Sequence, residues 1–196
     1  MSEKLDLNYW DQRWQEGRTE WDIGYPSPAL MEFARQFPLR EQHVLIPGCG
    51  NAYEAEALLE LGYTHITLLD ISPTLTTKLR QRFGFASDKI QVVCEDFFLH
   101  EGRYDLILEQ TFFCALPPCM RPQYVKKMAE LLNPNGRLAG LLFITPFDNE
   151  GPPFGGTFEE YQQLFGEHFH ILRMELTPLS IPQRQGREVF FEATVR

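Results

Sequence analysis

The chain has 196 residues, of which 43% are hydrophobic and 23% charged, and this is the size and composition of one globular domain. We therefore predict a single domain over residues 1–196 and exclude a fibrous or disordered protein. The 18 basic and 27 acidic side chains give a net charge of −9, which repels phosphate backbones and anionic membranes. Neither nucleic acid nor a membrane is an expected partner.

Two further absences narrow the class of protein. No apolar run is long enough to span a bilayer, and the first residues lack the apolar core of a signal peptide, so we expect a cytoplasmic protein. The four cysteines form no C-x-x-C pair, so neither a disulfide framework nor a metal site is expected.

The first part of the chain predicts two helices joined by a loop. Trp10 and Trp14 fall at helical spacing within an amphipathic segment over residues 5–18. Residues 21–28 contain two prolines and a glycine, which predict an ordered loop rich in aromatic side chains. Helical periodicity resumes over residues 29–37.

After residue 40 the pattern changes to alternating strands and helices. The predicted strands cover residues 44–46, 66–69, 90–93, 104–108 and 138–144, and the predicted helices cover 52–61, 73–83 and 122–132. Strands this apolar belong in a sheet covered on both faces, and the alternation predicts an α/β fold with a doubly wound, mostly parallel sheet. Two extended runs, 169–176 and 188–195, predict an antiparallel strand pair at the end of the sheet.

The first predicted strand ends in Gly48-Cys49-Gly50 and leads directly into a helix. Such a turn points backbone N–H groups at a ligand, and the glycines let that ligand approach the backbone closely. Asp70 follows the second strand about 20 residues later, where doubly wound folds bind the hydroxyl groups of a ribose. The alternative is that Asp70 only caps the helix that starts after Ser72.

Two features select the nucleoside. A dinucleotide site has a third glycine in the turn, but here that position is Tyr53, which argues against a bound pyrophosphate. Asp96 follows the third strand and could accept an adenine amino proton, with Phe97 packed on the ring. An adenosine without a pyrophosphate indicates S-adenosylmethionine, whose sulfonium cation suits an acidic protein rich in tryptophan.

These residues also resemble a known family. The segments that carry the resemblance are Trp10, Trp14, Trp21, residues 44–50, Leu69-Asp70-Ile71-Ser72, Asp96-Phe97-Phe98, Thr111-Phe112-Phe113-Cys114-Ala115, residues 131–136 and Gly151-Pro152-Pro153-Phe154. Together they resemble the thiopurine S-methyltransferase family of class I methyltransferases, and most of all its thiol and halide methyltransferase branch. The resemblance covers nearly the whole chain, although Glu109-Gln110 departs from both branches and leaves the nucleophile open.

The resemblance implies a Rossmann-like methyltransferase domain with an N-terminal helical lid and S-adenosylmethionine as cofactor. With the glycine turn included, the expected cofactor-binding residues are Trp10, Trp14, Trp21, Gly48, Gly50, Asp70, Asp96, Phe97 and Gln110. We assign the three tryptophans to the lid and not to the core, because Trp10 and Trp14 share a helical face and Trp21 lies in the loop.

The expected substrate is a small molecule with a soft nucleophile: a thiol, sulfide, thiocyanate or halide, with thiopurines as a further option. Candidate residues for an apolar substrate wall are Tyr25, Phe112, Phe113 and Phe154, with ordinary core packing as the alternative for each. The chain shows no obvious general base, which fits a nucleophile that is already an anion, and we assign no catalytic residue. A nicotinamide-dependent oxidoreductase and a non-catalytic module that senses S-adenosylmethionine remain the alternatives.

Overall fold

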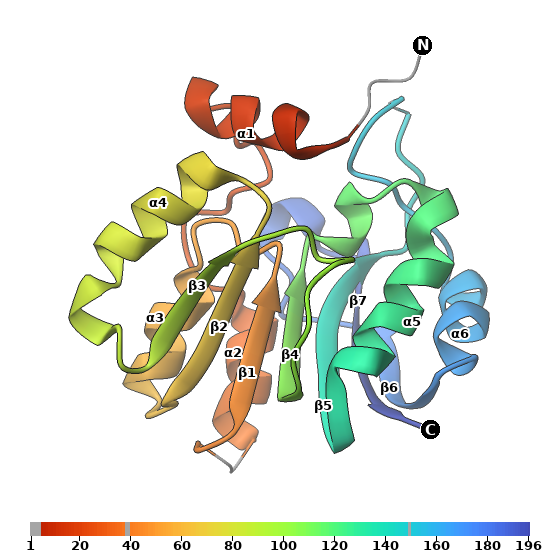
Figure 1. The fold of residues 1–196 in the computed structure, drawn as a ribbon. Helices are drawn as coiled ribbons and strands as arrows, with labels where there is room; N and C mark the ends of the chain where they lie inside the picture. Colours follow the sequence, from red (N-terminus) through yellow and green to blue (C-terminus); the bar gives the residue numbers. More distant parts are fainter. Residues whose placement is uncertain (1–4, 38–39, 149) are drawn as a thin grey trace.

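A computed structural model describes residues 5–37, 40–148 and 150–196 of the chain (Figure 1). A seven-stranded sheet forms its centre, with the strand order β3-β2-β1-β4-β5-β7-β6. The strands are β1 (His43–Pro47), β2 (His65–Asp70), β3 (Ile90–Cys94), β4 (Tyr104–Gln110), β5 (Leu132–Phe143), β6 (Phe169–Leu176) and β7 (Glu188–Val195). Strand β7 pairs antiparallel with β5 and β6, and the pairs among β1 to β5 are parallel, which confirms the predicted sheet.

The described residues form six α-helices around this sheet. They are α1 (Leu7–Glu16), α2 (Pro28–Gln36), α3 (Tyr53–Glu60), α4 (Pro73–Arg82), α5 (Arg121–Leu131) and α6 (Phe158–Gly166). No helix of the described residues has the length and apolar character needed to cross a membrane.

Capping residues explain where α4 begins and where α1 begins and ends. The Ser72 hydroxyl accepts the Leu75 N–H at 3.1 Å and Pro73 occupies the first turn, so Ser-Pro starts α4 as predicted. The Asp6 carboxylate caps α1, and Gly17 ends it with φ 69°, a left-handed conformation that glycine adopts without strain.

Helix α6 was not expected from the sequence. Its first residue follows Thr157, whose hydroxyl accepts the Glu160 N–H at 3.1 Å. Tyr161 and Phe165, four residues apart, are fully buried on one face of the helix. The spacing of these two aromatic residues after a threonine cap is the signal that could have predicted α6.

Strand β5 begins earlier than expected. Residues 133–136 predicted a break, but the chain enters the sheet at Leu132. The break appears instead as an irregularity within the strand, because Asn135 has φ 66° and the pairing with β4 shifts there.

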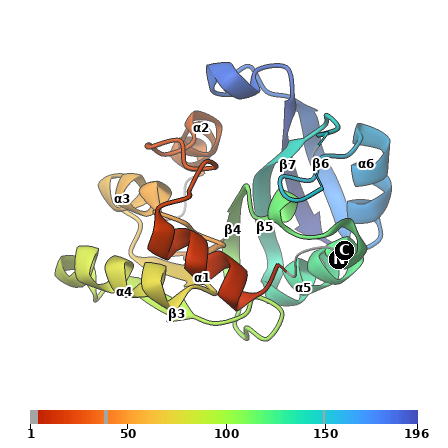
Figure 2. The ribbon, with the colours of Figure 1, turned by 90° about the horizontal axis from the view of Figure 1, so that it is seen from above.

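The core lies on both faces of the sheet, and alternate residues of each strand contribute to it. On β1, Val44 and Ile46 face one cluster, with α2, α3 and α4, whereas Leu45 faces the other, with α5 and α6. Helix α1 covers neither face. It lies above the arrowheads of β1 and β2, and the view from above shows it crossing this edge (Figures 1 and 2).

Candidate active site

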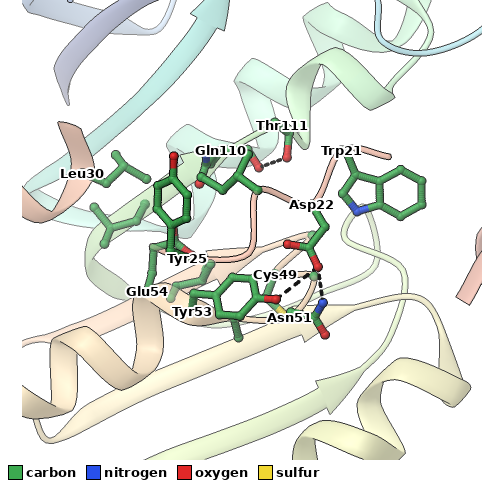
Figure 3. Close-up of a pocket in the computed structure, with 16 residues that line it drawn as sticks. Trp21, Asp22, Tyr25, Leu30, Cys49, Asn51, Tyr53, Glu54, Gln110 and Thr111 are labelled. Carbon is green, nitrogen blue, oxygen red and sulfur yellow. Dashed lines mark hydrogen bonds between the residues drawn. The ribbon is translucent and has the colours of Figure 1, made fainter. Parts of the chain in front are cut away.

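A pocket opens at the carboxyl ends of β1 and β4 (Figure 3). Its walls come from the loop before α2, the glycine turn with the start of α3, and the end of β4. The lining residues are Trp21, Asp22, Ile23, Tyr25, Leu30, Ile46, Gly48, Cys49, Gly50, Asn51, Ala52, Tyr53, Glu54, Leu108, Gln110 and Thr111. Five residues predicted for the cofactor or substrate are among them: Trp21, Tyr25, Gly48, Gly50 and Gln110.

The two glycines of the turn serve different purposes. Both have a positive φ, 56° at Gly48 and 52° at Gly50. A Cβ atom on Gly48 would lie 2.5 Å from the Phe112 ring, so Gly48 makes room for a protein side chain and not for a ligand. A Cβ atom on Gly50 would meet only the Trp14 ring, at 3.9 Å, which leaves the backbone open for close approach. Close approach of a ligand therefore stays a prediction for Gly50, whereas the space at Gly48 is taken by Phe112.

Asp70 lies behind this turn, at the end of β2. Its carboxylate accepts the Ser72 N–H at 2.9 Å, while Ser72 itself caps α4, so Asp70 is not the helix cap. Burial raises the pKa of Asp70 to about 6, although the backbone N–H groups of Ser72, Gly50 and Ile71 act in the opposite direction. The carboxylate is thus held against the glycine turn, in the place predicted for it.

The three tryptophans meet, as their spacing predicted. The rings of Trp10 and Trp14 each pack edge-on against Trp21, with centroids 5.5 and 5.7 Å apart. Trp21 lines the pocket, but Trp14 is only 7% exposed and belongs to the hydrophobic core. The assignment of all three to a lid and not to the core is therefore wrong for Trp14, because the helix face that carries it packs downward onto the fold.

A buried acid holds the turn that follows β4. Oε1 of Glu109 accepts the N–H groups of Phe112 and Phe113 at 2.9 and 2.8 Å, and burial raises the pKa of Glu109 to about 7. Thr111 has φ 61°, an unusual conformation for a β-branched residue, and it lines the pocket beside Gln110. Glu109 therefore fixes the strained turn that brings Gln110 and Thr111 to the pocket.

The acidic loop after β3 lies outside this pocket. Asp96 accepts the Phe98 N–H at 2.9 Å. Phe97 is 4% exposed and packs on Phe112 and Tyr124, with ring centroids 5.1 and 5.5 Å apart. The structure therefore places Phe97 in the core and not on an exposed wall where an adenine ring could pack.

The aromatic residues predicted for a substrate wall separate in the structure. Tyr25 is 44% exposed and lines the pocket. Phe113 is 1% exposed within the core, which corrects its assignment as a substrate residue, because its ring packs against aromatic residues of α5 and α6. Phe112 fills the space at Gly48, and Phe154 donates its N–H to Cys114 at 2.7 Å, outside the pocket lining.

Hydrogen bonds from distant segments hold the loop before α2, and sequence reasoning missed them. Asp22 accepts hydrogen bonds from Asn51 and Tyr53, and Glu54 accepts the Ser27 N–H at 2.8 Å. Arg184, far along the chain, donates to the Trp21 carbonyl at 3.0 Å. These contacts join residues that are far apart in the chain, so no local sequence pattern predicts them. The only available signal is that Asn51 and Glu54 follow directly after the glycine turn.

Cys49 lies within the glycine turn but cannot act as a nucleophile in this state. It is 7% exposed, and burial raises the pKa of its thiol well above the usual range, as does the nearby Asp70 carboxylate. The thiol therefore stays protonated, and Cys49 packs as a small apolar residue.

Comparison with known proteins agrees with this geometry. The family model for thiopurine S-methyltransferase matches residues 5–194. The chain is 32% identical to probable thiol methyltransferase 2 and 33% identical to thiocyanate methyltransferase 1, both of Arabidopsis thaliana; each match covers 91% of this chain and 81% of the relative. It also resembles the crystal structure of Burkholderia thailandensis 1,6-didemethyltoxoflavin-N1-methyltransferase, with a TM-score of 0.74, 20% identity and coverage of 96% and 86% of the two chains.

The sheet order with its antiparallel β7, and the glycine turn at the end of β1, are those of the class I methyltransferase fold. Within that class, the chain belongs to the thiopurine S-methyltransferase family. It is an S-adenosylmethionine-dependent methyltransferase, as the resemblance of its motifs implied.

Proposed function

We propose that this methyltransferase acts on a small molecule with a soft nucleophile, namely a thiol, hydrosulfide, thiocyanate or halide, with thiopurines as larger alternatives. Its similarity to a probable thiol methyltransferase and to a thiocyanate methyltransferase supports this substrate class. The observation that carries the proposal is a pocket that joins the glycine turn to the end of β4 and has apolar walls, with no histidine among its described lining residues.

The residues around the turn fit the cofactor. Gly50 leaves the backbone open, and Asp70 and Asp96 lie at the ends of two neighbouring strands. We assign Asp70 to the ribose hydroxyls and Asp96 to the adenine amino group. When bound, S-adenosylmethionine supplies a methyl carbon attached to a positively charged sulfur.

The residues that line the pocket position the two reactants and exclude water. Leu30, Ile46 and Leu108 form an apolar floor and wall, while the Gln110 amide and Thr111 hydroxyl lie where the nucleophile would enter. Holding the reactants in line is worth up to ~7–11 kcal/mol of a reaction barrier. Positioning alone is therefore an adequate mechanism for a nucleophile that arrives as an anion.

We assign no general base among the described residues that line the pocket. Its two carboxylates, Asp22 and Glu54, are held by hydrogen bonds from the protein. We therefore expect thiols to react as thiolates formed in solution, so that the rate rises with pH up to the pKa of the substrate.

The test is product detection by mass spectrometry after incubation with S-adenosylmethionine and, in turn, hydrosulfide, small thiols, thiocyanate and iodide. A methylated product confirms the proposal, and a flat pH profile for a thiol with a pKa of ~8.5 contradicts attack by a free thiolate. Binding of the cofactor without turnover on any of these would instead favour the sensing module. The oxidoreductase is disfavoured because Tyr53 and Asp22 occupy the start of α3, where a pyrophosphate would bind.

A further inference from the structure

The loop before α2 brings a carboxylate into the pocket. Asp22 points at Asn51 and Tyr53, at the start of α3 (Figure 3). Its Oδ2 accepts hydrogen bonds from the Asn51 amide and, at 3.2 Å, from the Tyr53 hydroxyl, while its Oδ1 accepts the Gly24 N–H at 2.7 Å. These three contacts hold the carboxylate in a fixed orientation beside the glycine turn.

Asp22 keeps both a charge and an acceptor site. Its three donors are neutral groups, and an ionised carboxylate has about four lone-pair sites, so about one site remains for a ligand. The second carboxylate, Glu54, is only 7% exposed and accepts the buried Ser27 N–H. Among the described residues that line the pocket none is lysine, arginine or histidine. Asp22 therefore presents its carboxylate to the occupant of the pocket, and the Arg82 guanidinium, 5.4 Å from the centroid of the Tyr53 ring, is paired with Glu56.

The strand order determines which end of the cofactor reaches this charge. Along the sheet edge, β3, β2, β1 and β4 are neighbours, and they lead to Asp96, Asp70, the glycine turn and Gln110 respectively. With adenine at Asp96 and ribose at Asp70, the substituent on the ribose continues toward the glycine turn and the pocket. In S-adenosylmethionine and S-adenosylhomocysteine that substituent ends in an amino acid, with one ammonium and one carboxylate group.

We propose that Asp22 binds the α-ammonium group of the cofactor and that the Tyr53 hydroxyl positions Asp22 for this contact; the proposal rests on the methyltransferase function inferred above. A carboxylate and an ammonium group form a charge-assisted hydrogen bond, stronger than a neutral one. This role explains why a tyrosine occupies position 53, where a dinucleotide site has its third glycine. The same carboxylate repels a pyrophosphate at the start of α3.

Calorimetry with two ligands tests this contact. S-adenosylhomocysteine carries the amino acid, whereas 5′-methylthioadenosine has the same adenosine without it. Asp22→Asn should weaken binding of S-adenosylhomocysteine about tenfold or more and change binding of 5′-methylthioadenosine by less than about twofold. Tyr53→Phe should produce a smaller loss with the same ligand selectivity. Glu20→Gln, which removes a charge from the exposed part of the loop, is the matched control and should leave both affinities unchanged.

Other outcomes overturn the proposal. An equal loss for both ligands in Asp22→Asn would mean that Asp22 only holds the loop in place. Tighter binding of S-adenosylhomocysteine would place Asp22 beside the carboxylate of the ligand and not beside its ammonium group. If Asp22→Asn melts too early for calorimetry, Tyr53→Phe answers the same question, because it keeps the charge. A wild-type protein that binds neither ligand would instead refute the proposed function.

Discussion

The Asp11 carboxylate accepts a 2.6 Å hydrogen bond from the hydroxyl of Ser72, and this contact joins α1 to the first turn of α4. Thr74 adds two more hydrogen bonds to the same carboxylate, from its N–H at 2.9 Å and its hydroxyl at 3.1 Å. Burial opposes ionisation of Asp11, but the hydrogen bonds from Ser72 and Thr74 help to lower its pKa below the usual value. One buried acid thus attaches the tryptophan-bearing helix to the edge of the sheet.

Asp11→Ala should detach α1. A hydrogen bond to a charged group contributes about 1.5–3 kcal/mol, and the variant leaves Ser72 and Thr74 without their acceptor. We expect faster hydrogen exchange in α1 and weaker binding of S-adenosylhomocysteine. Gln12→Ala, which removes an exposed contact on the same helix, is the control. Unchanged exchange in α1 would show that the tryptophans alone hold the helix.

Trp14→Ala and Trp10→Ala should differ in their effect on stability. Trp14 is buried in the core, so its removal should lower the free energy of unfolding by ~3–5 kcal/mol, whereas the half-buried Trp10 should cost clearly less. Both should weaken cofactor binding, since both pack against Trp21. Denaturant unfolding and calorimetry measure the two effects separately. Equal destabilisation by the two substitutions would contradict the placement of Trp14 alone in the core.

Cofactor affinity should depend on pH through Asp70. With a pKa of about 6, the carboxyl group is mostly ionised at pH 7 and becomes protonated below pH 6, where it loses its capacity to accept both ribose hydroxyls. Affinity for S-adenosylhomocysteine should therefore be nearly constant above pH 7 and fall up to tenfold per pH unit below about 6. Asp70→Asn should bind more weakly and lose this dependence. Titrations at several pH values decide the matter, and a profile that Asp70→Asn leaves intact would exclude Asp70 as its origin.

Glu109→Gln should stabilise the protein at high pH. The pKa of Glu109 rises from 4.5 to about 7 on folding, so the folded state holds the proton more tightly and loses stability as pH rises from 4.5 through 7. The full effect is roughly 3 kcal/mol. The glutamine oxygen can still accept the Phe112 and Phe113 N–H groups, so the variant should melt higher than wild type at pH 8 and similarly or lower at pH 5. The exposed Glu101→Gln is the control, and a difference that does not change with pH would refute this account.

The sequence predicts most of the fold because short-range patterns determine it. Apolar runs mark the strands, Ser72-Pro73 marks the start of α4, and the glycine turn leads into α3. The place of Asp70 in the fold is predictable for the same reason, since it depends only on the end of one strand.

The rest of the site depends on contacts that no local pattern contains. Phe112 and Phe113 are adjacent aromatic residues, yet one fills the space at Gly48 and the other is buried in the core. The backbone conformation of Thr111 determines which way each of the two rings points. Its positive φ is not predictable from the sequence, because threonine rarely adopts this conformation. Asp22 contacts Tyr53 across 31 positions in the chain, so its place in the pocket depends on how the loop folds back.

The position of β7 affects how the chain can fold during synthesis. This strand is the last of the seven in sequence, yet it lies between β5 and β6. Until residues 188–195 have left the ribosome, β6 has no partner strand in the sheet and the edge of β5 stays open. Arg184 contacts Trp21, which lies 163 residues earlier in the chain. The loop over the pocket therefore lacks this contact until Arg184 has left the ribosome. A nascent chain should therefore acquire cofactor affinity only after residues 184–195 have left the ribosome, and until then the unpaired edge of β5 is a site where chaperones or other nascent chains can bind.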